Sequence, residues 1–314
     1  MKFEILDPRP IEAAKVANEK IFASGPVLGI EVTVPALAAR CQLGNIDPQH
    51  TGGNKDLAAI EVALTAELPP ADAVLATVRA DLDSVGAMAV LSMRAEGIIF
   101  TTDMDMAVYE IASYDKFARG DWPGQQLLPS RENPWPEKFA HLAPEVLAVE
   151  DFKVPLNKRV HGIEKMIALA DCSCSSASAE YHKRAKDERM AMIEALENGQ
   201  IKVDLQDYLV VVESIHKAAI NPVGYSFAPV VVALNPEFQP RADVPSVRKF
   251  TIAQYQAGYV DLKAVTAELN QLEPGTTTDS KWGGSPTIVG SPQGVSSALT
   301  VDQVVAVVEK YLIK

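Results

Sequence analysis

Carboxylate and imidazole side chains follow apolar runs at two places in the first third of the chain. RADLDSVGA holds Asp81 and Asp83 one residue apart, and GNIDPQHTGG, residues 44–53, holds Asp47 and His50. Two neighbouring carboxylates repel each other, and a divalent cation would resolve that repulsion. Carboxylate and imidazole together suit manganese, iron or zinc better than calcium. These residues therefore indicate a metal site. The alternatives are a helix cap at Asp83 and a plain turn at the Asp-Pro pair.

Two further stretches carry weaker signals. TTDMDMAVYE contributes Asp103 and Asp105, which either bind metal or begin a helix. WGGSPTIVGSPQG contains Gly283, Gly284 and Ser285, whose backbone amides could hold a phosphate group. The alternative for this second stretch is an ordinary glycine turn between a helix and a strand.

Some reaction classes are not expected from the motifs. The remaining histidines are not paired with a serine or cysteine in a nucleophile motif, which argues against a Ser-His or Cys-His hydrolase. Neither GxGxxG nor GxxxxGK[ST] occurs, which argues against a dinucleotide-binding or P-loop enzyme.

Length, composition and charge indicate which broad class of protein the chain belongs to. The chain has 314 residues, of which 47% are hydrophobic and 22% charged, as expected for a globular protein of two domains or one large one. A net charge of −12 argues against binding to extended nucleic acid, which requires a basic face. We expect a cytoplasmic protein with no membrane contact, because no secretory signal or long apolar run occurs and the three cysteines are odd in number.

The apolar patterns around these residues alternate between those typical of strands and those typical of helices. PVLGIEVTVP and DAVLATVRADLD favour strands, GIIFTTDMD favours a strand or strand end, and SVGAMAVLSMRAEG favours a helix. This alternation predicts an α/β fold: a parallel-sheet N-terminal domain with helices on both faces and a smaller C-terminal α/β domain. We expect the first domain over residues 1–199, with a helical connector at about 175–199, and the second over residues 200–314.

These stretches resemble the DHH phosphoesterase superfamily, as a divergent and permuted member. The C-terminal strand, helix, WGGSP loop and final helix resemble the DHHA1 domain. RADLDSVGAMAVL is similar to the first motif of the family, and IDPQH is similar to its Asp-His-His motif. Thr77 and Ser285 stand where the family has histidines, and the two motifs occur in reversed order.

The resemblance implies hydrolysis of a phosphodiester or phosphoanhydride by a water molecule bound to one or two divalent metal ions, most often manganese. It implies that Asp47, His50, Asp81 and Asp83 are ligands, with Asp81, Asp83 and His50 catalytic. It also implies a bridging carboxylate from Asp103 or Asp105. The implied phosphate contacts come from the C-terminal glycine loop and two arginines: Gly283, Gly284, Ser285, Arg79 and Arg248.

The expected substrate is a small nucleotide, a short oligonucleotide or polyphosphate, and a homodimer is one option for assembly. Two alternatives remain open from the sequence. One is a catalytically degenerate family member that binds a phosphorylated ligand or a protein without hydrolysis, as the missing histidines suggest. The other is a sugar-phosphate or acyl-phosphate enzyme on an unrelated α/β fold.

Overall fold

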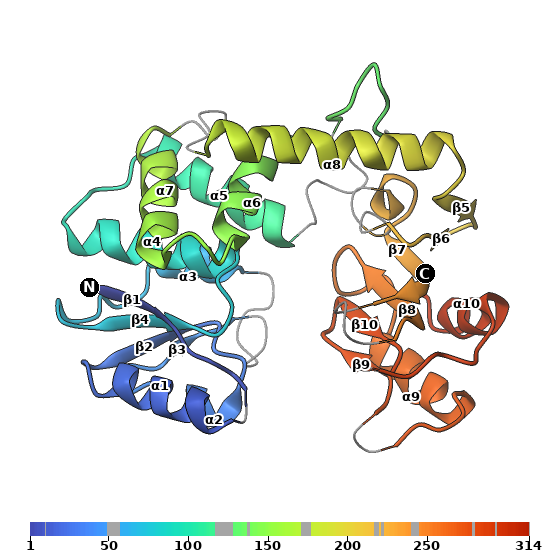
Figure 1. Ribbon diagram of the computed structural model, residues 1–314, viewed down its shortest axis with the longest axis horizontal. Helices are drawn as coiled ribbons and strands as arrows, with labels where there is room; N and C mark the ends of the chain where they lie inside the picture. The colour runs from blue at the N-terminus through green and yellow to red at the C-terminus, as the bar shows by residue number, and fades with distance from the viewer. Residues whose placement is uncertain are drawn as a thin grey trace. The chain divides into compact units, whose positions relative to one another are not determined.

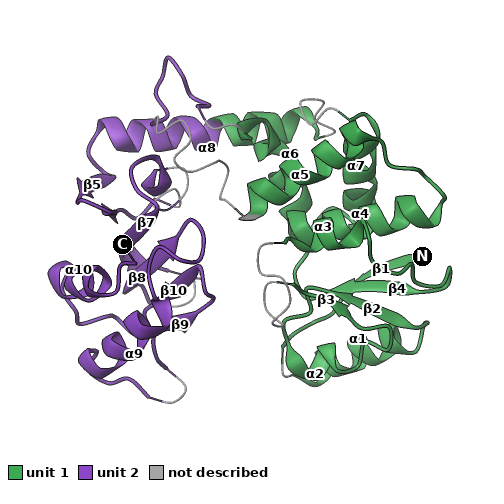
Figure 2. Ribbon diagram, turned by 180° about the vertical axis from the view of Figure 1, so that it is seen from behind, with its two compact units in different colours: residues 1–116, 139–186 green, residues 117–138, 187–314 purple. Residues whose placement is uncertain are grey.

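The computed structural model describes most of the chain (Figure 1). The described residues are 1–9, 11–48, 57–116, 128–136, 139–170, 177–216, 220, 223–239, 245–277, 280–292 and 294–313. The chain divides into two compact units, coloured separately in Figure 2: unit 1 comprises Met1–Lys116 and Phe139–Lys186, and unit 2 comprises Phe117–Lys138 and Asp187–Lys314. The division falls inside helix α8 (Ala179–Glu197), whereas the predicted domain boundary lies just after this helix.

Unit 1 is built on a parallel sheet of four strands in the order β1-β4-β2-β3. The strands are short: β1 (Lys2–Ile5), β2 (Val27–Ile30), β3 (Asn45–Ile46) and β4 (Val74–Thr77). All four residues of β2 and of β4 are buried, as expected for a parallel sheet covered on both sides. The prediction of an α/β fold with a parallel sheet is confirmed.

Helices cover both faces of this sheet (Figure 1). One face packs on α1 (Glu12–Phe22) and α2 (Pro35–Ala38) through a small apolar cluster around Val27 and Val74. The larger core on the other face contains side chains of five helices: α3 (Ala59–Ala63), α4 (Leu82–Ala95), α5 (Thr102–Lys116), α6 (Ala143–Glu150) and α7 (Leu156–Ala168). A short 3-10 helix, η1 (Ala140–Leu142), precedes α6.

Helix α4 is the central helix of unit 1, because every side chain from Leu82 to Met93 is buried. Its small residues allow close packing: a Cβ on Gly86 would lie 2.6 Å from Cδ1 of Ile60 in α3. The expected strand at GIIFTTDMD does not form. Residues 98–101 are irregular, Ile99 is 87% exposed, and α5 begins at Thr102. An apolar run without a sheet neighbour to pair with remains a loop.

Unit 2 is built on a mixed sheet of six strands in the order β5-β6-β7-β8-β10-β9. The strands are β5 (Lys202–Leu205), β6 (Leu209–Glu213), β7 (Val230–Phe238), β8 (Val247–Gln254), β9 (Gly283–Gly284) and β10 (Ile288–Gly290). Only β6 and β7 pair in parallel among these strands. One face packs on α9 (Leu262–Leu272) and α10 (Val301–Lys310), and the other on α8 and η3 (Gly224–Ser226).

None of the described helices is both long enough and apolar enough to cross a membrane.

Candidate functional site

Acidic residues follow three neighbouring strands of the unit 1 sheet. Glu31 comes directly after β2, Asp47 comes directly after β3, and Asp81 and Asp83 follow β4. Because β4, β2 and β3 are parallel and adjacent, their carboxyl ends meet at one edge of the sheet. That edge is where open α/β sheets bind their ligands.

Asp81 is the N-cap of helix α4. Its Oδ1 accepts hydrogen bonds from the Ser84 amide at 3.1 Å and from the Ser84 hydroxyl at 2.8 Å, and its own amide donates to Ser84 Oγ. Its other oxygen, Oδ2, lies 3.6 Å from Nε of Arg79, whose side chain is 79% exposed. The helix-capping alternative from the sequence is therefore realised, at Asp81 rather than at Asp83.

Asp83 is completely buried and caps a different helix. Its two carboxylate oxygens accept hydrogen bonds from the amides of Ala59, at 2.7 Å, and Ile60, at 2.8 Å, at the start of α3. Burial raises the pKa of Asp83 to about 7, in spite of these two hydrogen bonds, and the negative charge of Asp81 adds to the shift. Asp83 thus joins α4 to α3 beneath the edge of the sheet.

Glu31 is a site residue that the sequence does not single out. Burial raises its pKa to about 10, and the negative charges of four aspartates add to this shift: Asp83, Asp81, Asp115 and Asp47. The backbone of Glu31 is left-handed, with φ of 51°, a conformation that is rare for any residue except glycine. The signal in the sequence is its place directly after an apolar run, but PVLGIEVTVP has the pattern of one continuous strand.

Helix α5 contributes its last turn to this acidic cluster and not its first. Asp103 and Asp105 are exposed in the first turn of α5, as the helix-start alternative predicts. Asp115, near the other end of the helix, is the α5 residue whose charge acts on Glu31. Asp47 is 3% exposed and forms part of the cluster, whereas His50 lies outside the described residues.

We call these five residues the acidic cluster: Glu31, Asp47, Asp81, Asp83 and Asp115. Hard oxygen donors of this kind suit manganese or magnesium, and neighbouring like charges, two of them buried at Asp47 and Asp83, are what a cation would neutralise. Among the residues described, however, no group of three or more His, Cys, Asp or Glu side chains is arranged so that it could hold a metal ion. The cluster therefore matches a divalent cation in its chemistry but does not converge on one point.

Thr77 stands at the end of β4, at the position that the resemblance noted in the sequence aligns with a histidine. It is fully buried, its hydroxyl donates to the Arg79 carbonyl at 2.9 Å, and it accepts from the Arg79 amide at 3.2 Å. Thr77 therefore shapes the turn that leads to Asp81 and does not offer a free ligand to the cluster.

The predicted glycine loop of unit 2 is a tight β-hairpin. Gly283 and Gly284 form β9, and the Ser285 amide donates to the carbonyl of Ile288 at 2.8 Å. The Ser285 hydroxyl accepts in turn from the Ile288 amide at 3.2 Å. An ordinary glycine turn, the alternative from the sequence, therefore accounts for this stretch without a bound ligand. Phosphate binding by the exposed glycines stays a prediction.

Arg248, the second predicted phosphate contact, has internal partners in unit 2. Its guanidinium lies over the ring of Phe250, 4.7 Å from the ring centroid. It also donates to the carbonyl oxygens of Ser297 and Leu299, just before α10. These contacts tie the chain between β10 and α10 to the sheet, so the structure gives Arg248 a positioning role.

Comparison with known proteins gives little further information. No protein-family model matches the chain, and no curated protein sequence matches it. Among solved structures, a pGpG-specific phosphodiesterase, PggH, from Vibrio cholerae is 12% identical, with a TM-score of 0.38 over 77% of this chain and 80% of that one. An uncharacterized protein from Helicobacter pylori G27 is 10% identical, with a TM-score of 0.24 over 99% and 98% of the two chains. Both scores are too low to support conclusions about this protein.

Proposed function

We propose that the protein is a metal-dependent phosphoesterase that hydrolyses a phosphodiester or phosphoanhydride of a small nucleotide, a short oligonucleotide or polyphosphate. The observation that supports this most directly is the acidic cluster at the carboxyl edge of a parallel sheet. Structural carboxylates are usually paired with cationic side chains, whereas burial and the negative charge of neighbouring carboxylates raise the pKa of Glu31 and of Asp83. A divalent cation bound at this edge would offset that like charge.

The residues proposed to hold the metal are Asp47, Asp81, Asp83 and Glu31, with His50 retained from the sequence. We expect one or two ions, with manganese first. The ion would lower the pKa of a bound water and offset the negative charge that develops on the phosphoryl group. Asp103 and Asp105 are not part of this proposal, because Asp115 is the α5 residue whose charge reaches Glu31.

Residues of the chain itself supply the other requirements of this reaction. Arg79 is exposed beside Asp81, where its cationic group can meet a phosphate oxygen. Helix α4 begins at the same edge of the sheet, and the positive end of its dipole favours an anion there. Both features would draw a phosphorylated substrate toward the cluster in spite of its negative charge.

The alternative function is binding of a phosphorylated ligand or a protein partner without hydrolysis. Two observations favour it. The carboxylates of Asp81 and Asp83 already cap helices, and Thr77 and Ser285 occupy the places of family histidines with their hydroxyl groups in local hydrogen bonds. A protein of this kind would keep the fold and the anion preference but would not turn over its ligand.

The test compares variants that keep the helix caps and remove the charge. Asparagine caps a helix about as well as aspartate, so Asp81→Asn and Asp83→Asn change the cluster with the smallest change in fold. Asp261→Asn is the matched control, because Asp261 caps α9 in unit 2 through the Ala264 amide at 3.0 Å and is exposed. Metal content is measured on the pure protein, and hydrolysis of bis-(p-nitrophenyl) phosphate is followed with added manganese.

We expect bound or bindable manganese, turnover by the unmodified chain, and a loss of at least about 100-fold in kcat/KM for both cluster variants, as for removal of a group that stabilises the transition state. Asp261→Asn should keep full activity. Metal binding without turnover would favour the binding function. Absence of both metal and turnover, with all four proteins folded by circular dichroism, would overturn the hydrolase proposal.

A further inference from the structure

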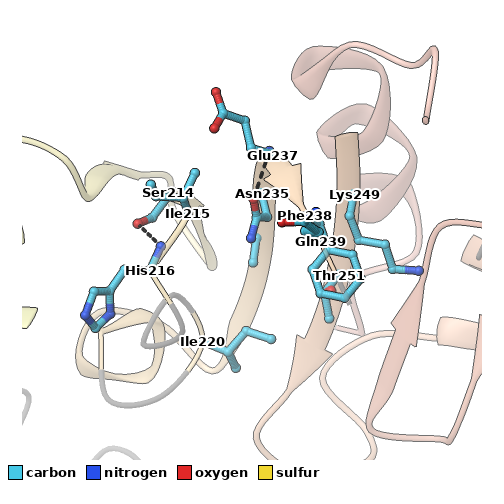
Figure 3. A pocket seen from close by; sticks show the side chains of 11 residues that line it. Ser214, Ile215, His216, Ile220, Asn235, Glu237, Phe238, Gln239, Lys249 and Thr251 are labelled. Atoms are coloured by element: carbon cyan, nitrogen blue, oxygen red, sulfur yellow. Dashed lines mark hydrogen bonds between the residues drawn. The ribbon is translucent and has the colours of Figure 1, made fainter. Parts of the chain in front are cut away.

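Unit 2 contains a pocket that belongs to none of the predicted sites. Its volume is about 560 Å³, within the range typical of small-molecule sites. Figure 3 shows it on one face of the sheet, at the carboxyl end of β6 and between β7 and β8. Ala233 pairs with Thr251 and Asn235 with Lys249 across these two strands, so the side chains of all four share this face.

The side-chain amide of Asn235 lines the pocket and is hydrogen-bonded at one end within the described residues. Oδ1 of Asn235 accepts a hydrogen bond from the Glu237 amide at 2.9 Å, and this contact fixes the orientation of the side chain. The other end of the amide, Nδ2, has no hydrogen-bond partner among the residues described, and in Figure 3 it points away from the Glu237 amide. A β-bulge between Asn235 and Phe238 breaks the strand register at this point, as bulges next to binding sites often do.

Two hydroxyl groups and one ammonium group add further donors. The hydroxyl of Thr251 has no partner among the described side chains and backbone groups. Ser214 is 3% exposed, and its oxygen accepts from the His216 amide at 2.8 Å, so its hydrogen has no acceptor in the parts of the chain that the structure describes. The ammonium group of Lys249 donates to the Ser291 carbonyl and pairs with no carboxylate in the described part of the chain. Burial lowers the pKa of Lys249, as expected for a cation without a counter-charge.

Acidic groups in the pocket are few. Among the lining residues that the structure describes, Glu237 alone carries a carboxylate; it is exposed, and its carboxyl group is turned away from the other side chains in Figure 3. Isoleucine side chains, including Ile220 in the lower part of the view, supply apolar surface. The pocket thus offers hydrogen-bond donors that have few acceptors nearby, and it also offers apolar surface. These two features match a ligand that combines an anionic group with an apolar organic group.

We infer that this pocket binds a small organic anion, whose phosphate or carboxylate group accepts hydrogen bonds from Asn235 and Thr251. The ammonium group of Lys249, which reaches over β10 to the Ser291 carbonyl, contributes positive charge at the other side of the pocket. The site consists of residues of unit 2 alone, so the inference does not rest on the proposed hydrolase activity. It assigns unit 2 a ligand site apart from the hairpin of β9 and β10.

The test uses calorimetric titration of the full chain with phenylphosphonate, benzoate and neutral benzamide. Phenylphosphonate has no ester bond to hydrolyse, and a chelator in the buffer prevents any metal in unit 1 from holding it. We expect one of the two anions to bind and benzamide to bind at least about tenfold more weakly, because a charged acceptor strengthens each hydrogen bond. The tighter of the two anions identifies the head group as phosphate-like or carboxylate.

Asn235→Asp is the decisive variant, because it keeps the acceptor for the Glu237 amide and replaces the Nδ2 donor by a negative oxygen. We expect at least a tenfold loss of anion affinity. Gln256→Glu adds the same charge at an exposed position of unit 2 and should leave the affinity unchanged. If Asn235→Asp does not fold, Thr251→Val, of nearly the same shape, decides the question with an expected loss of about threefold or more.

The inference fails if neither anion binds at millimolar concentration, if benzamide binds as well as the anions, or if the folded Asn235→Asp protein keeps its affinity. Because no outcome here depends on turnover, a failure at this pocket leaves the hydrolase proposal intact, and a failure of that proposal leaves the pocket intact.

Discussion

Asp81 and Asp83 are one residue apart, yet they hold the ends of two different helices. Asp81 caps the helix in which Asp83 lies, and Asp83 caps α3 through two amides in the interior of unit 1. Residues proposed for catalysis therefore also serve the fold. Alanine variants at these positions would lower stability as well as any activity, which is why the proposed tests use asparagine.

Asp83→Ala should destabilise unit 1 strongly. It leaves the buried amides of Ala59 and Ile60 without acceptors, and each such loss costs about 1–3 kcal/mol. Asp83→Asn keeps one carbonyl acceptor and should lose less. Urea unfolding followed by far-UV circular dichroism measures both. Equal stabilities for the two variants would show that the two hydrogen bonds contribute little.

Glu31→Gly should raise stability while it removes a member of the acidic cluster. Glycine adopts a φ of 51° without the steric penalty of about 1–2 kcal/mol that other residues incur, and the change also removes a half-buried carboxylate. Glu31→Gln removes the charge and keeps the backbone strain, so the difference between the two variants isolates the strain.

Ala170 provides a matched control for this prediction. It follows α7 with φ of 50° and carries no charge, so Ala170→Gly should be stabilised by the backbone effect alone. Thermal unfolding of the three variants compares the effects. A Glu31→Gly protein less stable than Glu31→Gln would contradict backbone strain at residue 31.

At the scale of elements, the pairing of β9 with β10 explains why Gly284 has no room for a side chain whereas the adjacent Gly283 has room. A Cβ on Gly284 would collide with the backbone carbonyl of Ile288, whereas a Cβ on Gly283 would meet no atom within 4 Å. The hairpin therefore requires glycine at one of the two positions. The sequence predicts a phosphate loop here, with a glycine turn as the alternative, and it does not distinguish the two glycines.

Gly284→Ala should destabilise unit 2, by about 1–3 kcal/mol as for other backbone-strain substitutions, and Gly283→Ala should change stability by less than about 0.5 kcal/mol. Tryptophan fluorescence during urea unfolding measures both, because Trp282 immediately precedes the hairpin and is buried. Similar losses for the two variants would show that the close approach at Gly284 does not determine stability.

For the whole molecule, the positions of the tryptophan residues allow the unfolding of the two units to be followed separately. Trp135 and Trp282 lie in unit 2, and Trp122 falls in the same sequence segment as Trp135. Each unit has its own apolar cores, so we expect the units to unfold independently.

Asp83→Ala in unit 1 should therefore shift part of the circular dichroism transition and leave the tryptophan fluorescence transition in place. Gly284→Ala in unit 2 should shift the tryptophan fluorescence transition together with the other part of the circular dichroism transition. If each variant shifts both signals equally, the chain unfolds as one cooperative body.

The sequence by itself determined the α/β class, the parallel sheet of unit 1 and the helix at SVGAMAVLSMRAEG. These features follow from local apolar periodicity, which one segment carries without its neighbours. It also determined that Asp47, Asp81 and Asp83 follow strands, because a strand end is visible where an apolar run meets polar residues.

Only the tertiary structure decided which acidic residues act on one another. Glu31 and Asp115 lie far from Asp83 in sequence, and Asp115 joins the cluster instead of Asp103 because α5 brings its last turn to it. The unit 2 pocket has the same origin, since Ser214, Asn235 and Thr251 become neighbours only when β6, β7 and β8 pair. Periodicity reports how a segment folds, whereas strand order and helix packing depend on contacts between distant segments.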